Sequence, residues 1–231
     1  MRWYEKYVAL RNKLYKNKAI LSVYSYFMST VPKRRAGKRM KKNGASDLEK
    51  LFHILADYNL EAFCDFGTLL GAIREHGFIP HDYDLDIGII QTRDFSWEQL
   101  QKALRNSKII LEEYCAYNGN ITEQTYRLPS KITVDLFLYE ICDGSMTTYV
   151  YYKDHEMLYD KSTRRSVKRL VYPVIEGVKW IDFLGKRVLV PVNAEKHLEA
   201  IYGKTWKIPD PGYKPDRKQD IMPGLGDKIK G

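Results

Sequence analysis

Two aspartates separated by a single residue, Asp84 and Asp86, are the clearest chemical signal in the chain. They lie in a stretch, 84–90, that follows a glycine-containing segment and begins by alternating acidic with apolar residues. Because residues i and i+2 of a strand point to the same face, the two carboxylates would stand side by side. Like charges at such range resist joint ionisation, and a hard divalent cation with oxygen ligands is the usual compensation. The pair therefore predicts a Mg²⁺ or Mn²⁺ site and phosphoryl chemistry.

A third carboxylate, Asp135, lies in a second strand-like stretch, 131–139, between Val134 and Leu136. An acid in an apolar strand is costly if it is buried without a partner. We therefore expect this strand to lie beside the first, so that Asp84, Asp86 and Asp135 form one metal-binding and catalytic site. The alternative is that Asp135 lies on an edge or a solvent-facing side of the sheet.

Upstream of the acids, Gly67 and Thr68 lie where a strand turns into a helix. Backbone N–H groups at a helix N-terminus bind phosphate well, although a plain tight turn would explain the pair equally. Arg74, on the helix that follows, could grip phosphate oxygens bidentately or could be a surface arginine. Arg127 and Lys131, just before the Asp135 strand, are weaker phosphate-binding candidates. These five residues form the predicted substrate-binding set.

Hydrophobic periodicity places the surrounding elements and predicts an α+β fold with a small mixed or antiparallel sheet flanked by helices. A helix is expected from Ser46, where Ser46 and Glu49 have the spacing of a capping box, and another from Asn193 as its cap. Further helices are expected at 69–76 and 95–106, and strands at 85–90, 109–111, 125–128, 131–139, 148–152 and 185–191.

Positive charge is concentrated in the first 45 residues. They hold 13 Lys/Arg and one acid, Glu5, a balance of +12, whereas the formal charge of the whole chain is +9. The remainder is thus slightly acidic, so no nucleic-acid partner is expected. Residues 1–31 are predicted to form amphipathic helices that end at Pro32, followed by a basic linker. This arm could pack on the body or could anchor the protein on anionic lipid, with RNA binding as a third reading.

These observations divide the chain into a basic amphipathic N-terminal arm (1–45), a catalytic domain (46–210) and an irregular C-terminal tail (211–231). The longest apolar run is shorter than the roughly 20 residues of a spanning helix, and no signal peptide is recognisable. Three cysteines without tight spacing argue against a disulfide framework. A cytoplasmic protein, peripheral at the inner face of the membrane, is the expectation.

The order of a Gly-Thr turn, an Asp-x-Asp strand and a third acid resembles the nucleotidyltransferase superfamily. Within it, three segments closely resemble the signature of the LicD family, which includes bacterial phosphocholine transferases and is related to fukutin and fukutin-related protein. These segments are Gly67-Thr-Leu-Leu-Gly-Ala-Ile-Arg74, Gly77-Phe-Ile-Pro80 and Asp82-Tyr-Asp-Leu-Asp-Ile87. Later landmarks at 172–173, 183–191 and 198–209 extend the resemblance to roughly residues 47–210. His81 departs from the family, which often has Trp there, and the arm has no counterpart.

The resemblance implies a nucleotidyltransferase-like fold and a transferase that uses a CDP-activated alcohol as donor. Such an enzyme moves phosphocholine, glycerol phosphate or ribitol phosphate to a sugar hydroxyl of a glycan or its lipid-linked precursor, and releases CMP. Lipopolysaccharide, teichoic acid and capsule are acceptors of this kind. Metals on Asp84, Asp86 and Asp135 would neutralise the pyrophosphate, and Asp135 could also deprotonate the acceptor. The alternatives are nucleotidyl transfer from an NTP with release of pyrophosphate, and a non-catalytic glycan- or lipid-binding relative.

Overall fold

The computed structural model describes residues 18–80, 82–153, 163–210 and 221–231, with side chains from residue 34. The chain divides into two compact units, Met1–Lys38 and Arg39–Gly231. The described part of the first unit is helical and belongs to α2 (Lys18–Asp57), whose last turns lie in the second unit. None of the described helices is long and apolar enough to cross a membrane.

Helix α2 corrects two boundary predictions. It continues through Pro32, because the residues that follow, Lys33 to Lys42, are mostly good helix formers that carry the pattern onward. Ser46 therefore lies inside the helix and caps nothing. Glu49 does not complete a capping box; it accepts a hydrogen bond from the backbone N–H of Arg187 and pairs with Lys186.

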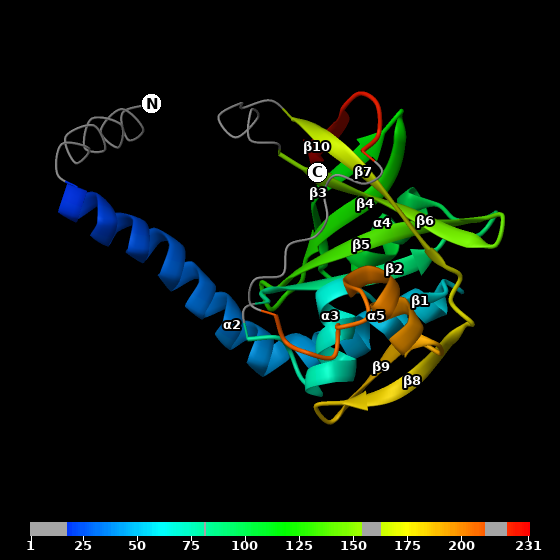
Figure 1. The fold of residues 1–231 in the computed structure, drawn as a ribbon, viewed down its shortest axis with the longest axis horizontal. Coiled ribbons are helices and arrows are strands. Elements are labelled where there is room, and N and C mark those ends of the chain that lie inside the picture. The colour runs from blue at the N-terminus through cyan, green and yellow to red at the C-terminus, as the bar shows by residue number, and fades with distance from the viewer. Residues whose placement is uncertain (1–17, 81, 154–162, 211–220) are drawn as a thin grey trace. The chain divides into compact units, whose positions relative to one another are not determined.

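The described strands form an eight-stranded mixed sheet with the order β1-β2-β5-β4-β3-β10-β7-β6, and a separate pair, β8-β9 (Figure 1). β2 and β5 run parallel, whereas the other described pairs are antiparallel. An additional pairing of β5 with β6 closes six strands into a barrel-like ring. The sheet is thus mixed, as predicted, but larger than predicted. The strands are β1 (Ala62–Cys64), β2 (Asp84–Ile90), β3 (Ile110–Tyr117), β4 (Asn120–Arg127), β5 (Thr133–Cys142), β6 (Ser145–Tyr152), β7 (Arg164–Pro173), β8 (Val178–Phe183), β9 (Lys186–Pro191) and β10 (Gly226–Lys230).

The described part of the second unit holds four further helical segments: α3 (Phe66–Leu70), the π-helical η1 (Gly71–Glu75), α4 (Trp97–Asn106) and α5 (Ala194–Tyr202). The predicted helices at 69–76, 95–106 and 194–202 are thereby confirmed to within a few residues. Asn193 precedes α5 but does not cap it, because its side chain bonds the backbone of Val174 and Glu176 instead.

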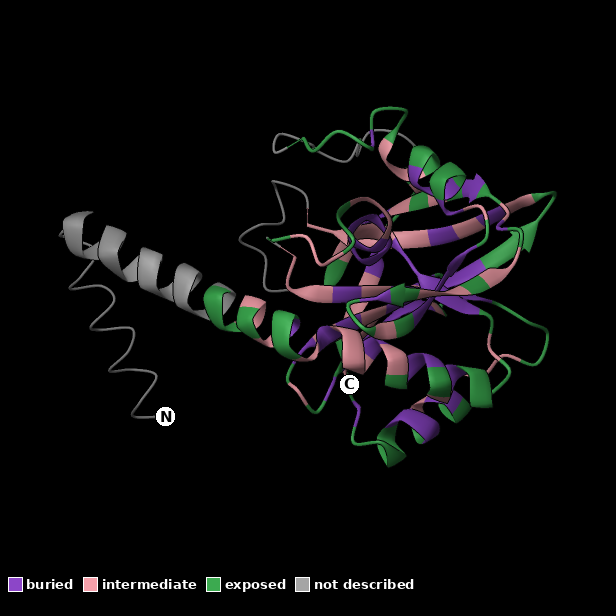
Figure 2. Ribbon diagram, turned by 90° about the horizontal axis from the view of Figure 1, so that it is seen from below, coloured by how far each residue is buried: buried purple, intermediate pink, exposed green. Residues whose placement is uncertain are grey.

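The main core lies on one face of β2 and β5, where alternate residues such as Leu85, Ile87 and Leu136 join Phe52 and Leu55 of α2. A second, smaller core includes Phe63, Phe137, Tyr139, Met146 and Tyr172. Figure 2 shows buried residues concentrated on the central strands and on the helices packed against them. With its apolar positions committed to the main core, β2 presents its acidic positions on the other face.

Sequence periodicity missed several strands. β7 and β8 were not predicted, and β10 lies in a tail that was predicted to be irregular. β10 pairs with both β3 and β7, so the prediction for its residues is wrong, whereas residues 211–220 lie outside the described part. A short, charged sequence such as Gly-Asp-Lys-Ile-Lys forms a strand here because two neighbours supply its hydrogen bonds.

The packing of Gly88 in β2 generates a test. A Cβ on Gly88 would overlap the ring of Phe63, its neighbour across the β1–β2 pair. We expect Gly88→Ala to lower the free energy of unfolding by about 1–3 kcal/mol through overpacking. Adding Phe63→Leu should recover part of this loss, which urea denaturation of the two single variants and the double variant would measure. Additive effects would contradict the contact.

Candidate active site

Asp84 and Asp86 begin β2, and the parallel pairing with β5 sets Asp86 directly opposite Asp135. Asp84 lies one step earlier on the same face, opposite Thr133. Neighbouring strands are about 4.8 Å apart, so the three residues are neighbours on one face of the sheet. The structure thus brings together the three predicted acids, and Asp135 is not on an exposed edge.

Two more aspartates enlarge the cluster. Asp82 hydrogen-bonds Asp84, and its carboxylate lies so close to Gly67 that any side chain at 67 would overlap it. Asp65 follows β1 and is fully buried. Besides burial, Asp82 and Asp65 both raise the pKa of Asp86. A side chain at 67 would therefore force the Asp82 carboxylate to move, independently of any role with phosphate.

Burial makes this cluster hard to ionise. It raises the pKa of Asp82 to about 8 and that of Asp135 to about 6, with neighbouring carboxylates adding to the effect. Burial, then Asp82, Asp84 and Asp135, hold the pKa of Asp86 well above its usual range. Bringing a divalent cation to these oxygens would restore their charged forms.

The donor set suits a hard cation because it consists of carboxylate oxygens. The arrangement, however, is not that of a ready site: in the described part of the chain no three His, Cys, Asp or Glu side chains are grouped to hold a metal. The side chains of Asp84, Asp86 and Asp135 would therefore have to rotate towards a shared ion. Metal binding stays a prediction.

The Gly67-Thr68 turn contacts the Asp-x-Asp strand directly. The Gly67 N–H donates to Asp86 Oδ2 (3.1 Å), and the Asp86 N–H donates to the Thr68 hydroxyl (2.8 Å). The Asp65 N–H adds a bond to the Asp86 carbonyl (3.0 Å). These bonds give the turn a clear role in fixing Asp86, while its predicted contact with phosphate is untested.

Asp65 is the centre of a buried network that the sequence did not predict. Its carboxylate accepts hydrogen bonds from the Tyr139 hydroxyl (2.5 Å) and the Phe66 N–H (2.8 Å) and lies 3.0 Å from His197 Nε2. Groups from three separate elements, α3, β5 and α5, therefore converge on one side chain. An Asp just before a helix is an N-cap signal that could have indicated Asp65, but nothing in the sequence indicated His197 as its partner.

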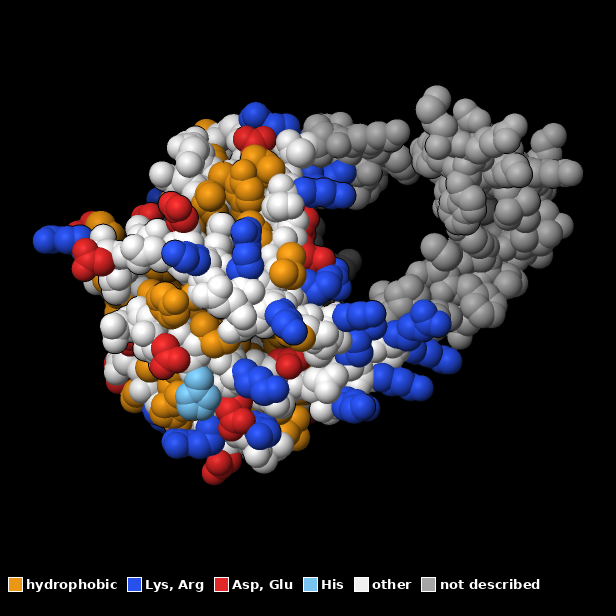
Figure 3. Space-filling view, turned by 180° about the vertical axis from the view of Figure 1, so that it is seen from behind, with side chains coloured by type: hydrophobic (Ala, Val, Ile, Leu, Met, Phe, Trp, Pro, Cys, Tyr) orange, Lys and Arg blue, Asp and Glu red, His pale blue; other side chains and the backbone are white. Residues whose placement is uncertain are grey.

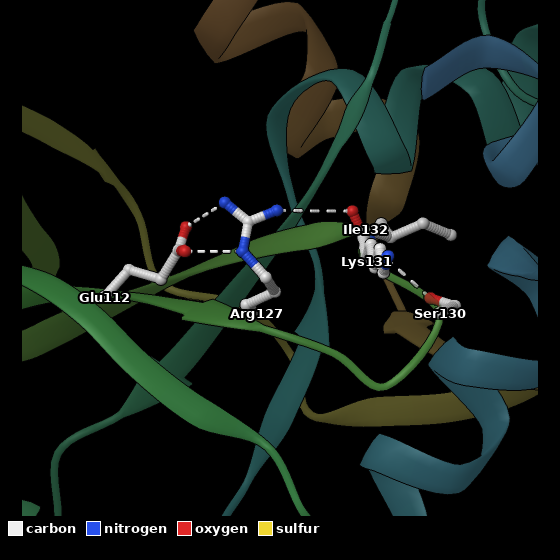
Figure 4. Close-up of polar contacts among 5 residues, drawn as sticks. All are labelled: Glu112, Arg127, Ser130, Lys131 and Ile132. Carbon is white, nitrogen blue, oxygen red and sulfur yellow. Dashed lines mark hydrogen bonds and ion pairs between the residues drawn. The ribbon is translucent and has the colours of Figure 1, made fainter. Parts of the chain in front are cut away.

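The predicted basic residues are engaged in other contacts. Arg74 is largely buried and bonds Glu75 and the Trp206 carbonyl (3.0 Å), which ties η1 to the segment after α5. Arg127 forms a two-pronged pair with Glu112, including a 2.7 Å contact, and Lys131 is exposed at the following turn (Figure 4). Arg127 lies in register with Thr133 and so belongs to the acidic end of the sheet. The structure gives no support to a phosphate grip by Arg74, whose donors serve the fold.

The polar face continues beyond Asp135 onto β4 and β3. The Thr125 hydroxyl donates to Asp135 Oδ1 (2.5 Å), and burial raises the pKa of Glu123, one step along the same face, to about 8. Lys228 of β10 forms a 2.7 Å ion pair with Glu113 and brings a positive charge to this part of the sheet. The sequence reasoning missed these residues because their approach depends on the β3–β4–β5 register and on an unpredicted strand.

Comparison with known proteins bears on this arrangement. Residues 59–193 match the family described as "LicD/FKTN/FKRP, nucleotidyltransferase domain", a range that contains all three strand aspartates and the Gly-Thr turn. The chain belongs to this family. It is 25% identical over 171 residues to "Ribitol-5-phosphate transferase FKTN" of Mus musculus, covering 73% of this chain and 34% of that protein. The Homo sapiens protein of the same description is 24% identical over 178 residues, with 76% and 34% covered.

An uncharacterized protein of Caenorhabditis elegans is 29% identical over 174 residues, covering 71% of this chain and 42% of the relative. The chain thus spans about a third to two fifths of the length of these relatives. Among solved structures, the lincomycin-bound lincosamide adenylyltransferase LnuA aligns with 65% of this chain and 82% of its own. The TM-score is 0.37 at 10% identity, a likeness too low to support an argument.

Tyr139 offers a test of the buried network. We expect Tyr139→Phe to lower the free energy of unfolding by about 1–3 kcal/mol, because the buried Asp65 carboxylate loses a donor. Chemical denaturation would measure this, with the exposed Tyr58→Phe as a control that should change stability by less than about 0.5 kcal/mol. Equal stabilities of the two variants would contradict the network.

Proposed function

We propose that this LicD-family protein is a metal-dependent phospho-alcohol transferase. In this proposal it moves a phospho-alcohol, ribitol phosphate first among the candidates, from a CDP-activated donor to a sugar hydroxyl of a glycan or its lipid-linked precursor. The observation that carries the proposal is the register that sets Asp86 opposite Asp135 with Asp84 beside them. The description of the fukutin relatives as ribitol-5-phosphate transferases supports the choice of ribitol phosphate over phosphocholine or glycerol phosphate.

A divalent cation on Asp84, Asp86 and Asp135 would neutralise the donor pyrophosphate and the charge that develops during in-line displacement. The acceptor hydroxyl oxygen attacks the phosphorus that bears the alcohol, and the bond from that phosphorus to the bridging oxygen of CMP breaks. Asp135 takes the hydroxyl proton and later returns it to solvent. The Thr125 hydroxyl holds one oxygen of Asp135, which orients the carboxylate for this role.

Product analysis tests this proposal against its alternatives. The full chain would be incubated with Mg²⁺, a sugar acceptor and, in separate reactions, CDP-ribitol, CDP-glycerol, CDP-choline or CTP. We expect CMP and a phosphodiester-linked acceptor from a CDP-alcohol. Pyrophosphate from CTP would instead indicate nucleotidyl transfer, and the absence of both products with every donor would indicate a non-catalytic relative.

The metal assignment gives a second, independent measurement. Mg²⁺ or Mn²⁺ should raise the melting temperature of the unchanged protein, and Asp86→Asn should abolish this rise and lower turnover by about a hundredfold or more. Without metal, Asp86→Asn should be at least as stable as the original, because an amide avoids the cost of ionising a carboxyl group in a crowded buried cluster. Asp94→Asn, at an exposed turn, is the matched control. A metal effect that persists in Asp86→Asn would refute the site.

The basic arm supports a further part of the proposal, namely that residues 1–45 hold the enzyme on anionic membranes. In the described part of α2, Arg34, Arg35 and Lys38 are exposed, and Figure 3 shows basic side chains gathered along this helix. Each such charge near anionic lipid adds about 1 kcal/mol at low salt.

Vesicle flotation tests the arm. The full chain should float with anionic vesicles, lose binding as salt rises and bind neutral vesicles weakly. Replacing Arg34, Arg35 and Lys38 by Gln should reduce flotation, whereas the same change at the exposed Lys102, Lys108 and Lys196 should not. Equal flotation of the two triple variants would favour an arm that packs on the body.

A further inference from the structure

A concave site lies away from the acid cluster. A hollow of about 200 Å³ is lined by residues of the β3–β4 turn, β5 and β6, together with Met222; they include Tyr117, Asn118, Asn120, Thr122, Glu140 and Tyr149. This volume is below the roughly 300–1,000 Å³ of pockets for drug-sized ligands, so it suits one small unit of a larger molecule.

The lining combines apolar rings with groups that both donate and accept hydrogen bonds. The rings of Tyr117 and Tyr149 are 5.7 Å apart and tilted by 33°, and Tyr149, the more exposed of the two, offers a flat surface to an apolar ligand face. Asn118, Asn120 and Glu140 supply amide and carboxylate groups at the rim. A ring with one apolar face and several hydroxyl groups, that is a sugar, matches this combination.

The charges around the hollow favour a neutral ligand. Tyr149 lies opposite Arg169 in the β6–β7 register. Burial raises the pKa of the Tyr149 hydroxyl, Glu140 raises it further and Arg169 lowers it. One negative and one positive side chain therefore flank the same ring. An isolated cation would be drawn to Glu140 but repelled by Arg169.

Distance along the strands decides which part of a substrate could reach the hollow. Glu140 lies five residues beyond Asp135 on β5, about 17 Å at the usual rise of a strand, and Thr122 lies three residues, about 10 Å, from Thr125. The alcohol attached to the reacting phosphorus cannot span this distance. Only a more distant part of an extended acceptor could reach it. Beside the hollow, Thr122 hydrogen-bonds Tyr151 (2.7 Å).

We propose that this hollow is an acceptor subsite for a neutral sugar unit that lies further along the glycan than the unit receiving the phospho-alcohol. The assignment of an acceptor rests on the proposed function, whereas sugar binding itself does not. The hollow would make the enzyme select extended acceptors over single sugars.

Ligand-observed NMR on the full chain tests binding directly, with neutral mono-, di- and trisaccharides of glucose, galactose, mannose and N-acetylglucosamine as probes. We expect di- or trisaccharide binding that weakens at least tenfold in Tyr149→Ala and is weakened in Glu140→Gln. Tyr58→Ala, at an exposed tyrosine elsewhere, should bind like the unchanged protein. Failure of every probe to bind, or displacement of a bound sugar by tetramethylammonium, would overturn the proposal.

Kinetics separates this proposal from the proposed function. Where a CDP-alcohol is turned over, Tyr149→Ala should raise KM at least tenfold for an extended acceptor and leave KM for a single sugar and for the donor unchanged. An equal rise for both acceptors would overturn the subsite. Sugar binding that depends on Tyr149, without turnover of any CDP-alcohol, would refute the proposed function and keep the subsite.

Discussion

The parallel register between β2 and β5 is the constraint on which the site depends. It places Asp86 and Asp135 opposite each other, which like-charge repulsion and burial both oppose. This unfavourable placement of the two aspartates is tolerated because the same register buries Leu85, Ile87 and Leu136 in the main core on the other face. A slip of one residue would exchange the two faces, moving carboxylates into the core, so the hydrophobic face and the acidic face specify each other.

The surrounding elements then fix the acids locally. Gly67 and Thr68 bond both the side chain and the backbone of Asp86, and Thr125 bonds Asp135. Behind the turn, Asp65 connects it to Tyr139 and His197, so that α5 supports the position of Asp86 through Asp65. Preorganisation of this kind matters for phosphoryl transfer, in which positioning and electrostatics provide most of the catalysis.

Local patterns in the sequence were sufficient to identify the three acids as strand residues on one face, because period-two alternation determines which strand residues share a face. They were also sufficient for α4 and α5, whose helical periodicity is strong. They could not identify Trp206 as the partner of Arg74, or His197 as the partner of Asp65, since the residues of each pair are 132 positions apart in the sequence. They were misleading at Pro32, where a local stop signal was outweighed by the helix formers on both sides, and at β10, whose strand conformation depends on β3 and β7.

The position of β10 in the sheet has a consequence for folding during synthesis. It lies between β3 and β7 although it follows both in the chain, so the six-stranded ring cannot close until Gly226–Lys230 has been made. Until then β3 and β7 each present an unpaired edge that could join another chain. Pairings between segments so distant in sequence form slowly. Nascent chains would therefore be most prone to aggregation just before this strand emerges.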